Sequence, residues 1–96
     1  MPLLRVERVR GEVLVIICDD ELLGKKFEEG DFILEVERSF YEGRRASVEE
    51  CLRALENATI ANIVGSMVEH AIKAGFVNAE NVIRIGGIPH AQIVKL

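Results

Sequence analysis

The sequence contains no tryptophan and few other aromatic residues: of its 96 residues, four are phenylalanine and one is tyrosine. A core must therefore be filled mainly by isoleucine, valine, leucine and alanine. The chain also has only two cysteines. Two cysteines do not make the dense disulfide framework of small secreted proteins, so we expect reduced thiols and a cytoplasmic protein.

Long apolar runs are missing as well. The longest, Val13–Cys18, is far shorter than the ~20 residues that a helix needs to cross a bilayer. No signal peptide is recognisable behind Met1, so we expect no membrane partner. With 49% hydrophobic and 29% charged residues, the composition is typical of one globular domain covering residues 1–96. The net charge of −4 does not favour nonspecific binding of nucleic acid, although it is compatible with a local basic patch.

Hydrophobic patterning in the first half predicts three strands. Leu3–Val9 and Glu12–Cys18 are rich in β-formers and are separated by Arg10-Gly11, which predicts a hairpin. The second of these strands is almost entirely apolar, so both of its faces should be covered. Asp19–Gly30 breaks the pattern and is expected to cross the sheet edge irregularly. Phe32–Glu37 alternates apolar and polar residues, as a half-exposed strand does.

The second half begins with a helical period. Ser47 and Glu50 fit a capping box at the start of one helix. Thr59 is expected to cap a second, long amphipathic helix that ends at Gly75. In that helix, the residues predicted to be buried are Ile63, Val64, Met67, Ala71 and Ile72. Those predicted to be exposed are Asn62, Glu69 and Lys73.

Two short strands, Asn81–Ile85 and Ala91–Leu96, close the chain and are joined by the loop Gly86–His90. The resulting order β-β-β-α-α-β-β predicts an α+β fold, a two-layer sandwich with two helices on one face of a mostly antiparallel sheet. Only Asp19–Gly30 remains to cover the opposite face. An uncovered apolar face favours a homodimer.

The Gly86–His90 loop is the first candidate site. Adjacent glycines allow close approach to a ligand, and His90 titrates near neutrality. An ordinary turn followed by an exposed histidine explains the same residues and is the commoner case. At the end of the apolar strand, Cys18 beside Asp19 is either half of a thiol–imidazole pair or, more often, a small buried hydrophobe. Neither histidine has ligand partners at metal-binding spacing, so we predict no metal and no cofactor.

Basic residues occur in local groups that would form an RNA-binding patch if the fold brought them together, but acidic residues are interleaved with them. Few aromatic residues are available nearby to stack bases. The alternative is a set of solvated surface charges, which the interleaving favours. The groups are Arg5/Arg8/Arg10, Lys25/Lys26, Arg44/Arg45, and Arg84 with Lys95.

Several stretches along the chain resemble the archaeal family named domain of unknown function 424. They are Glu12–Val15, Cys18-Asp19 with Leu22–Lys25, Phe40-Tyr41 with Gly43, Thr59–Gly65 and, most specifically, Asn81–Gln92. The resemblance implies an archaeal cytoplasmic protein of about this length with a two-layer α/β sandwich. It carries no activity, so no catalytic residue is transferred. It also implies an association with translation, which favours RNA or a translation-associated protein as the partner.

The sequence is therefore compatible with three functions. The first is a noncatalytic binding module for RNA or a translation-associated protein. The second is a small enzyme that uses His90 as its acid–base group, and the third is a structural or oligomerisation domain without a ligand site. Mid-helix Gly65 would be explained if the closing loop approached the predicted second helix there. The candidate binding residues are Gly86, Gly87, Pro89, His90, Gln92, Asn62, Asp19 and Lys25.

Overall fold

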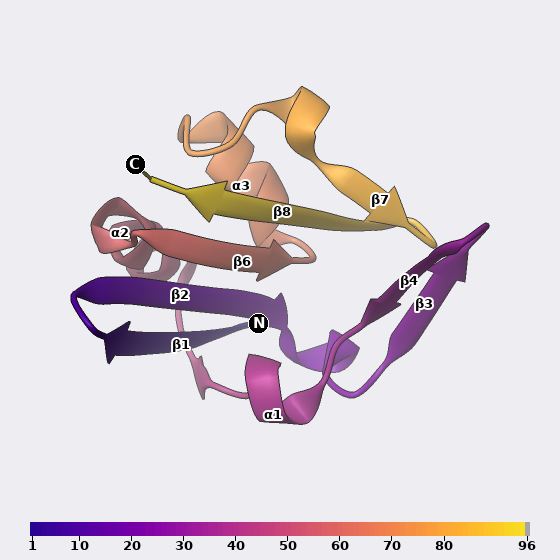
Figure 1. The fold of residues 1–96 in the computed structure, drawn as a ribbon, viewed down its shortest axis with the longest axis horizontal. Coiled ribbons are helices and arrows are strands. Elements are labelled where there is room, and N and C mark those ends of the chain that lie inside the picture. The colour runs from indigo at the N-terminus through magenta and orange to yellow at the C-terminus, as the bar shows by residue number, and fades with distance from the viewer. Residues whose placement is uncertain (96) are drawn as a thin grey trace.

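The computed structural model describes residues 1–95 and has an α+β fold built on a six-stranded, mostly antiparallel sheet. The strands lie in the order β5-β1-β2-β6-β8-β7, and a separate hairpin, β3–β4, lies at one end (Figure 1). The elements are β1 Pro2–Val9, β2 Glu12–Asp19, η1 Asp20–Leu22, β3 Lys26–Glu29, β4 Phe32–Glu35, α1 Arg38–Tyr41, β5 Arg44–Arg45, α2 Val48–Asn57, β6 Ile60–Val64, α3 Met67–Lys73, η2 Ala79–Asn81, β7 Ile83–Ile85 and β8 Ile88–Val94. Leu96, the end of the predicted strand Ala91–Leu96, lies outside the described residues.

The predicted first hairpin is confirmed. β1 and β2 pair antiparallel from Pro2 opposite Asp19 to Val9 opposite Glu12. The two residues between them, Arg10 (φ 52°) and Gly11 (φ 83°), both have positive φ. This is the backbone of a two-residue type I′ turn, whose twist matches that of the paired strands.

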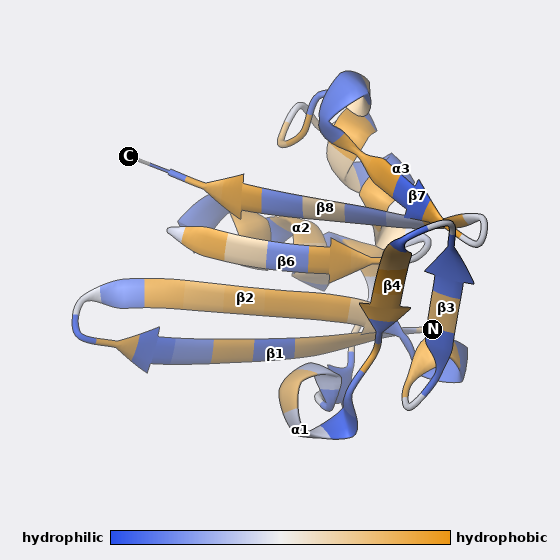
Figure 2. Cartoon of the chain, turned by 45° about the vertical axis from the view of Figure 1, so that its right-hand side comes forward, coloured by the Kyte–Doolittle hydropathy of each residue, from blue (hydrophilic) through white to orange (hydrophobic). Residues whose placement is uncertain are grey.

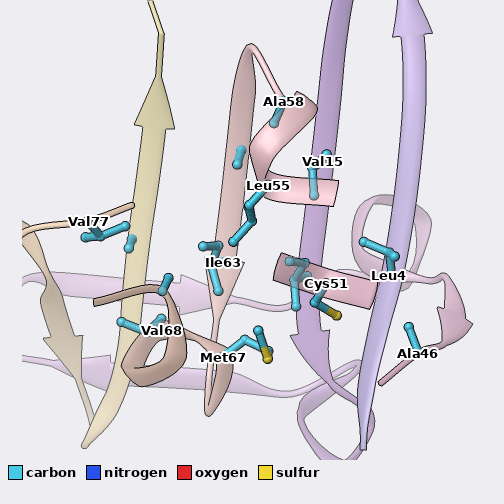
Figure 3. Packing of buried hydrophobic residues seen from close by; sticks show 14 residues of the cluster. Leu4, Val15, Ala46, Cys51, Leu55, Ala58, Ile63, Met67, Val68 and Val77 are labelled. Atoms are coloured by element: carbon cyan, nitrogen blue, oxygen red, sulfur yellow. The ribbon is translucent and has the colours of Figure 1, made fainter. Parts of the chain in front are cut away.

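β2 is covered on both faces, as its apolar sequence predicts. Val15 and Ile17 point towards α2 and α3, whereas Ile16 and Cys18 point the other way, and all four are 0–1% exposed. Figure 3 shows the helix side, where Cys51 and other side chains of both helices pack over β2 and β6. The predicted capping box at the start of α2 is confirmed.

The other face is covered only at one end. Residues of η1, β4 and α1 pack there against β2, β6 and β7. Part of the segment expected to be irregular, Asp19–Gly30, forms β3, which pairs with β4. In β4, Leu34 is buried, but Phe32 is 63% exposed beside the turn of the hairpin. The apolar face that suggested a homodimer is thus covered by the chain itself at this end.

The predicted long second helix is wrong. Its first part, Ile60–Val64, is strand β6, which pairs parallel to β2, and only Met67–Lys73 is helical. Gly65, at φ 98°, separates the two. The strand order β-β-β-α-α-β-β is wrong for the same reason, because β6 lies between α2 and α3. A parallel pair needs a crossover between its strands, and the chain from η1 to α2 provides it.

Most of the predicted burial holds despite the wrong element, because strand and helix bury overlapping sets of these residues. Ile63 and Val64 are both buried, but against opposite faces of the sheet rather than along one helix stripe. Among the predicted exposed residues, Asn62 is half-buried. Of the other residues predicted to be buried, Met67 and Ala71 are buried and Ile72 is partly buried. Glu69 and Lys73 are exposed, as predicted.

We predict that Ile63→Ala lowers the free energy of unfolding by about 2–5 kcal/mol, because it leaves a cavity under the helices. Ile60→Ala, three residues earlier in the same strand, should cost about 1 kcal/mol or less, because Ile60 is 36% exposed. Urea denaturation of both variants measures the difference. Equal losses would contradict the assignment of β6.

Candidate functional site

Three side chains meet through one amide oxygen. The Tyr41 hydroxyl donates to Oδ1 of Asn62 at 2.8 Å, and Nε2 of His90 lies 3.1 Å from the same oxygen. Tyr41 comes from α1, Asn62 from β6 and His90 from β8. We call these three residues the Asn62 cluster.

Strand register places the cluster on the sheet face opposite α2 and α3. Asn62 pairs with Gln92, and the next pair along, Val64 with His90, puts His90 diagonally across from Asn62. Side chains two residues apart in a strand share a face, so His90 and Gln92 stand side by side. Long side chains reach a diagonal neighbour across paired strands. The contact predicted between the closing segment and the Gly65 region is therefore present, but strand pairing makes it.

The hydrogen bonds define the protonation of His90. A carbonyl oxygen only accepts, so Nε2 carries the proton in the contact with Asn62. The neutral ring then leaves Nδ1 as an acceptor. Within residues 1–95 no buried side-chain nitrogen or oxygen lacks a hydrogen bond, and neither Nδ1 of His90 nor Nδ2 of Asn62 has a partner. Both atoms therefore reach solvent, one as an acceptor and one as a donor.

Burial governs the titration of this cluster. It raises the pKa of Tyr41 to about 12, with a smaller contribution from Cys18, so the hydroxyl stays protonated and donates. Burial also lowers the pKa of His90 below its usual 6.5, which favours the neutral ring. At neutral pH the cluster is therefore uncharged.

Cys18 is not paired with His90. The two residues are on the same face, but β6 lies between their strands, so they are separated by two strand spacings, or about 10 Å. The thiol lies 3.8 Å from the Tyr41 carbonyl and donates to it. Burial, and then Asp19 and Asp20, raise the pKa of Cys18 to about 11. Cys18 is thus a protonated core residue.

Asp19 has a structural partner. Its carboxylate accepts from the backbone N–H of Ser66 at 2.8 Å and from the Ser66 hydroxyl at 2.6 Å. Gly65 lies so close that a Cβ there would collide with the Asp19 carboxylate. The N–H of Gly65 donates to the Pro89 carbonyl at 2.9 Å. These contacts join the ends of β2, β6 and β8, which fixes the position of His90.

The glycine pair forms a shorter turn than predicted. Gly86 (φ 58°) and Gly87 (φ 80°) alone connect the strands, and the remainder of the predicted loop Gly86–His90 belongs to β8. The N–H of Gly86 donates to Oε1 of Glu29 at 2.9 Å, so it is not available to an anion. Lys25 lies between η1 and β3, where its backbone binds Leu22 and Val36, outside the Asn62 cluster.

Apolar side chains surround the polar centre. Ile60, Ile83 and Val94 share its face by register and are 36%, 52% and 65% exposed. We call Asn62, His90, Gln92 and these three residues the open face. Figure 2 shows the β3–β4 hairpin crossing one end of the sheet, with a hydrophilic band midway along β6.

Several cations of the predicted basic groups have acidic neighbours. Arg5 pairs with Glu7, Lys26 with Glu28, Arg44 with Glu50, and Arg45 with Asp20. Lys95 donates to two carbonyls at the end of α2. Four of the nine cations in the predicted groups are therefore paired with an acid, and a fifth donates to carbonyls.

Residues 1–95 contain neither a metal-binding cluster nor a membrane-spanning helix. No three histidine, cysteine, aspartate or glutamate side chains in this range are arranged to hold a metal ion. None of the helices in the same range has the length and apolar character needed to cross a membrane.

Sequence reasoning missed Tyr41, the third member of the cluster. Two signals were present: Phe40-Tyr41 is among the stretches that resemble the family, and a single tyrosine, when buried, usually finds a hydrogen-bond partner. The partner lies 21 residues away on another element, which no local pattern shows.

We predict that Gly65→Ala destabilises the protein by about 3 kcal/mol or more, because positive φ and the collision with Asp19 add together. Gly75→Ala is the matched control: its φ of 84° is similar, but open space surrounds it. It should cost about 1–2 kcal/mol. Urea denaturation measures both, and equal losses would show that Asp19 does not constrain Gly65.

His90 should titrate below pH 6.5 and carry its proton on Nε2, as ¹⁵N NMR of the imidazole can show. The unfolded chain takes up this proton at higher pH than the folded one. The contribution of His90 to stability is therefore full above pH 6.5, falls as the pH drops from 6.5 to the folded pKa, and changes no further below it. His90→Gln should reduce this acid sensitivity. A proton on Nδ1, or a pKa above 6.5, would contradict the geometry.

Comparison with known proteins gives a family and a fold. No curated protein matches the sequence significantly. A solved structure described as an uncharacterized conserved protein from Methanopyrus kandleri is similar, with a TM-score of 0.78 and 21% sequence identity over 99% of this chain and 93% of that one. At this identity the likeness shows the fold. The family model described as protein of unknown function DUF424 matches residues 7–96, and the chain therefore belongs to that family.

Proposed function

We propose that residues 1–96 form one domain that acts as a noncatalytic, cytoplasmic binding module, recognising another protein through the open face. The observation that supports this most is the Asn62 cluster. Its shared hydrogen bonds hold Asn62 and His90 in fixed positions while one donor and one acceptor remain free to a partner.

The free atoms suit a polypeptide. Nδ2 of Asn62 donates and Nδ1 of His90 accepts, which complements the C=O and N–H of an amide. The exposed Ile60, Ile83 and Val94 around them supply apolar area. Apolar contact around a few fixed polar groups is how protein interfaces are usually built.

The same surface is less suited to binding RNA. Binding of nucleic acid draws much of its affinity from unpaired cations that displace counterions. Here Arg5 is matched by Glu7, and the chain carries a net charge of −4. Tyr41 is buried and cannot stack on a base. A translation-associated protein, the partner class that the resemblance implies, is the better candidate.

Binding also suits the cluster better than acid–base catalysis. A catalytic histidine is usually oriented by a carboxylate, but Asn62 occupies that position for His90. Cys18 is protonated and faces the core, so it offers no nucleophile. The cluster supplies fixed, neutral hydrogen-bonding groups, which is what recognition needs.

We predict that His90→Ala weakens partner binding at least tenfold, equivalent to about 1.4 kcal/mol. It should cost only about 0.5–1.5 kcal/mol in stability, because Tyr41 still donates to Asn62. The tagged chain is used to capture partners from ribosomal and soluble fractions of its native host, with and without ribonuclease. Each captured protein is then titrated against the variants.

His70→Ala is the matched control, because His70 is an exposed histidine on α3, which packs on the opposite sheet face. It should bind like the wild type. Loss of capture after ribonuclease would identify RNA as the ligand, and a particle of twice 10.7 kDa in light scattering would identify a second copy of the chain. Either result, or equal binding by both variants, would overturn the proposal.

A further inference from the structure

One edge of β8 is only partly paired. β7 pairs with Ile88–His90 and with no later residue of β8. If β7 extended backwards in the same register, Asn81 would lie opposite Gln92. Asn81 instead belongs to η2, which is not part of the sheet. The position beside Gln92–Val94 is therefore left without a strand.

The backbone groups at this position point outward. The N–H of Gly65 donates to the carbonyl of Pro89, and the N–H of Lys95 donates to the carbonyl of Thr59. In an antiparallel pair the hydrogen-bonded residues alternate, so Ala91 and Ile93 face β6. The N–H and C=O groups of Gln92 and Val94 must then face the open edge. No backbone or side-chain partner for them is found in residues 1–95.

A cleft lies along this edge. It has a volume of about 240 Å³ and is lined by Gly75–Asn78, Asn81 and Gln92–Val94. This volume is below the range typical of drug-sized ligands. The unpaired edge of β8 is part of its lining and presents two N–H and two C=O groups at strand spacing. A short stretch of extended main chain is the occupant that would pair with all four.

We infer that an extended segment of the partner protein adds to the sheet here, running antiparallel to β8 in the place that β7 leaves empty. Three residues of the segment would span Gln92 to Val94, with the outer two making the hydrogen bonds. Strand addition of this kind takes affinity from the main chain and specificity from alternate side chains.

This inference rests on the proposed function and specifies its partner. Side chains of an added strand alternate between the two faces of the sheet. Those on one side would lie beside Gln92, on the open face near His90. Those on the other side would meet Val77 and Phe76 of the cleft. The same segment would thus occupy the edge and contact the Asn62 cluster.

The probe is a library of random twelve-residue peptides displayed on phage and selected on the immobilised full chain. Enriched peptides are synthesised and titrated by calorimetry. Val94→Pro removes one outward N–H without touching a bond to β6, and should weaken binding about tenfold or more. Val94→Thr changes the same side chain but keeps the N–H, so it should bind more tightly than Val94→Pro. Bound peptide should also slow hydrogen exchange at Gln92 and Val94.

A second test does not depend on the fold of a variant. Two versions of the peptide are made, one methylated at the odd-numbered amide nitrogens and one at the even-numbered. Only the version whose methyl groups replace the N–H groups that face β8 should lose binding to the wild-type chain. The inference is overturned if no peptide is enriched over a blank surface, if neither methylated register loses binding, or if Val94→Pro binds as the wild type does. If the peptides bind Val94→Pro as tightly as the wild type but do not bind His90→Ala, the proposed function is supported and strand addition at the β8 edge is not. If the peptides bind His90→Ala as tightly as the wild type but do not bind Val94→Pro, strand addition at the β8 edge is supported and the open face is not the binding surface.

Discussion

The apolar side chains of β2 must be kept from water on both sides of the sheet, and the rest of the fold follows from that. Val15 and Ile17 are buried by α2 and α3, and Ile16 and Cys18 by the elements that follow β2 along the chain. Burial of each such side chain contributes roughly 1.5–3 kcal/mol. In this chain of 96 residues β2 lies between β1 and β6 and contributes side chains to both buried clusters.

The two faces of β2 are covered to different extents. The helices α2 and α3 cover one face, η1, β4 and α1 cover only one end of the other, and the candidate site lies where this smaller cover ends. Tyr41 belongs to that cover, whereas Asn62 and His90 belong to the sheet beneath its margin. Side chains at such a margin are half-buried: dry enough for burial to lower the pKa of His90, and open enough for Nδ1 to meet a partner. The position of the polar cluster is thus a result of how far the chain could cover its own sheet.

Local signals in the sequence were sufficient for some elements and misleading for one. The first hairpin and the capping box depend on neighbours a few residues apart, so both could be predicted. Strand β6 could not, because Ile60, Ile63 and Val64 also match a helical stripe, and its partner β2 is distant in sequence. Its β-branched residues and Gly65 were the signals against a helix. His90 and Asn62 were identified as candidates, but Tyr41 was not, since only the fold brings α1 to β6.

The parallel pairing of β2 with β6 has a consequence for how the chain folds. Val13 and Thr59 bond to one another across 46 residues of sequence, whereas the two type I′ hairpins close over two residues each. Closing a longer loop loses more chain entropy before any contact compensates for it. Pairings between distant residues also slow folding. We therefore expect the hairpins to form early and the union of β2 with β6 to limit the folding rate, so that the Asn62 cluster assembles only in the last step.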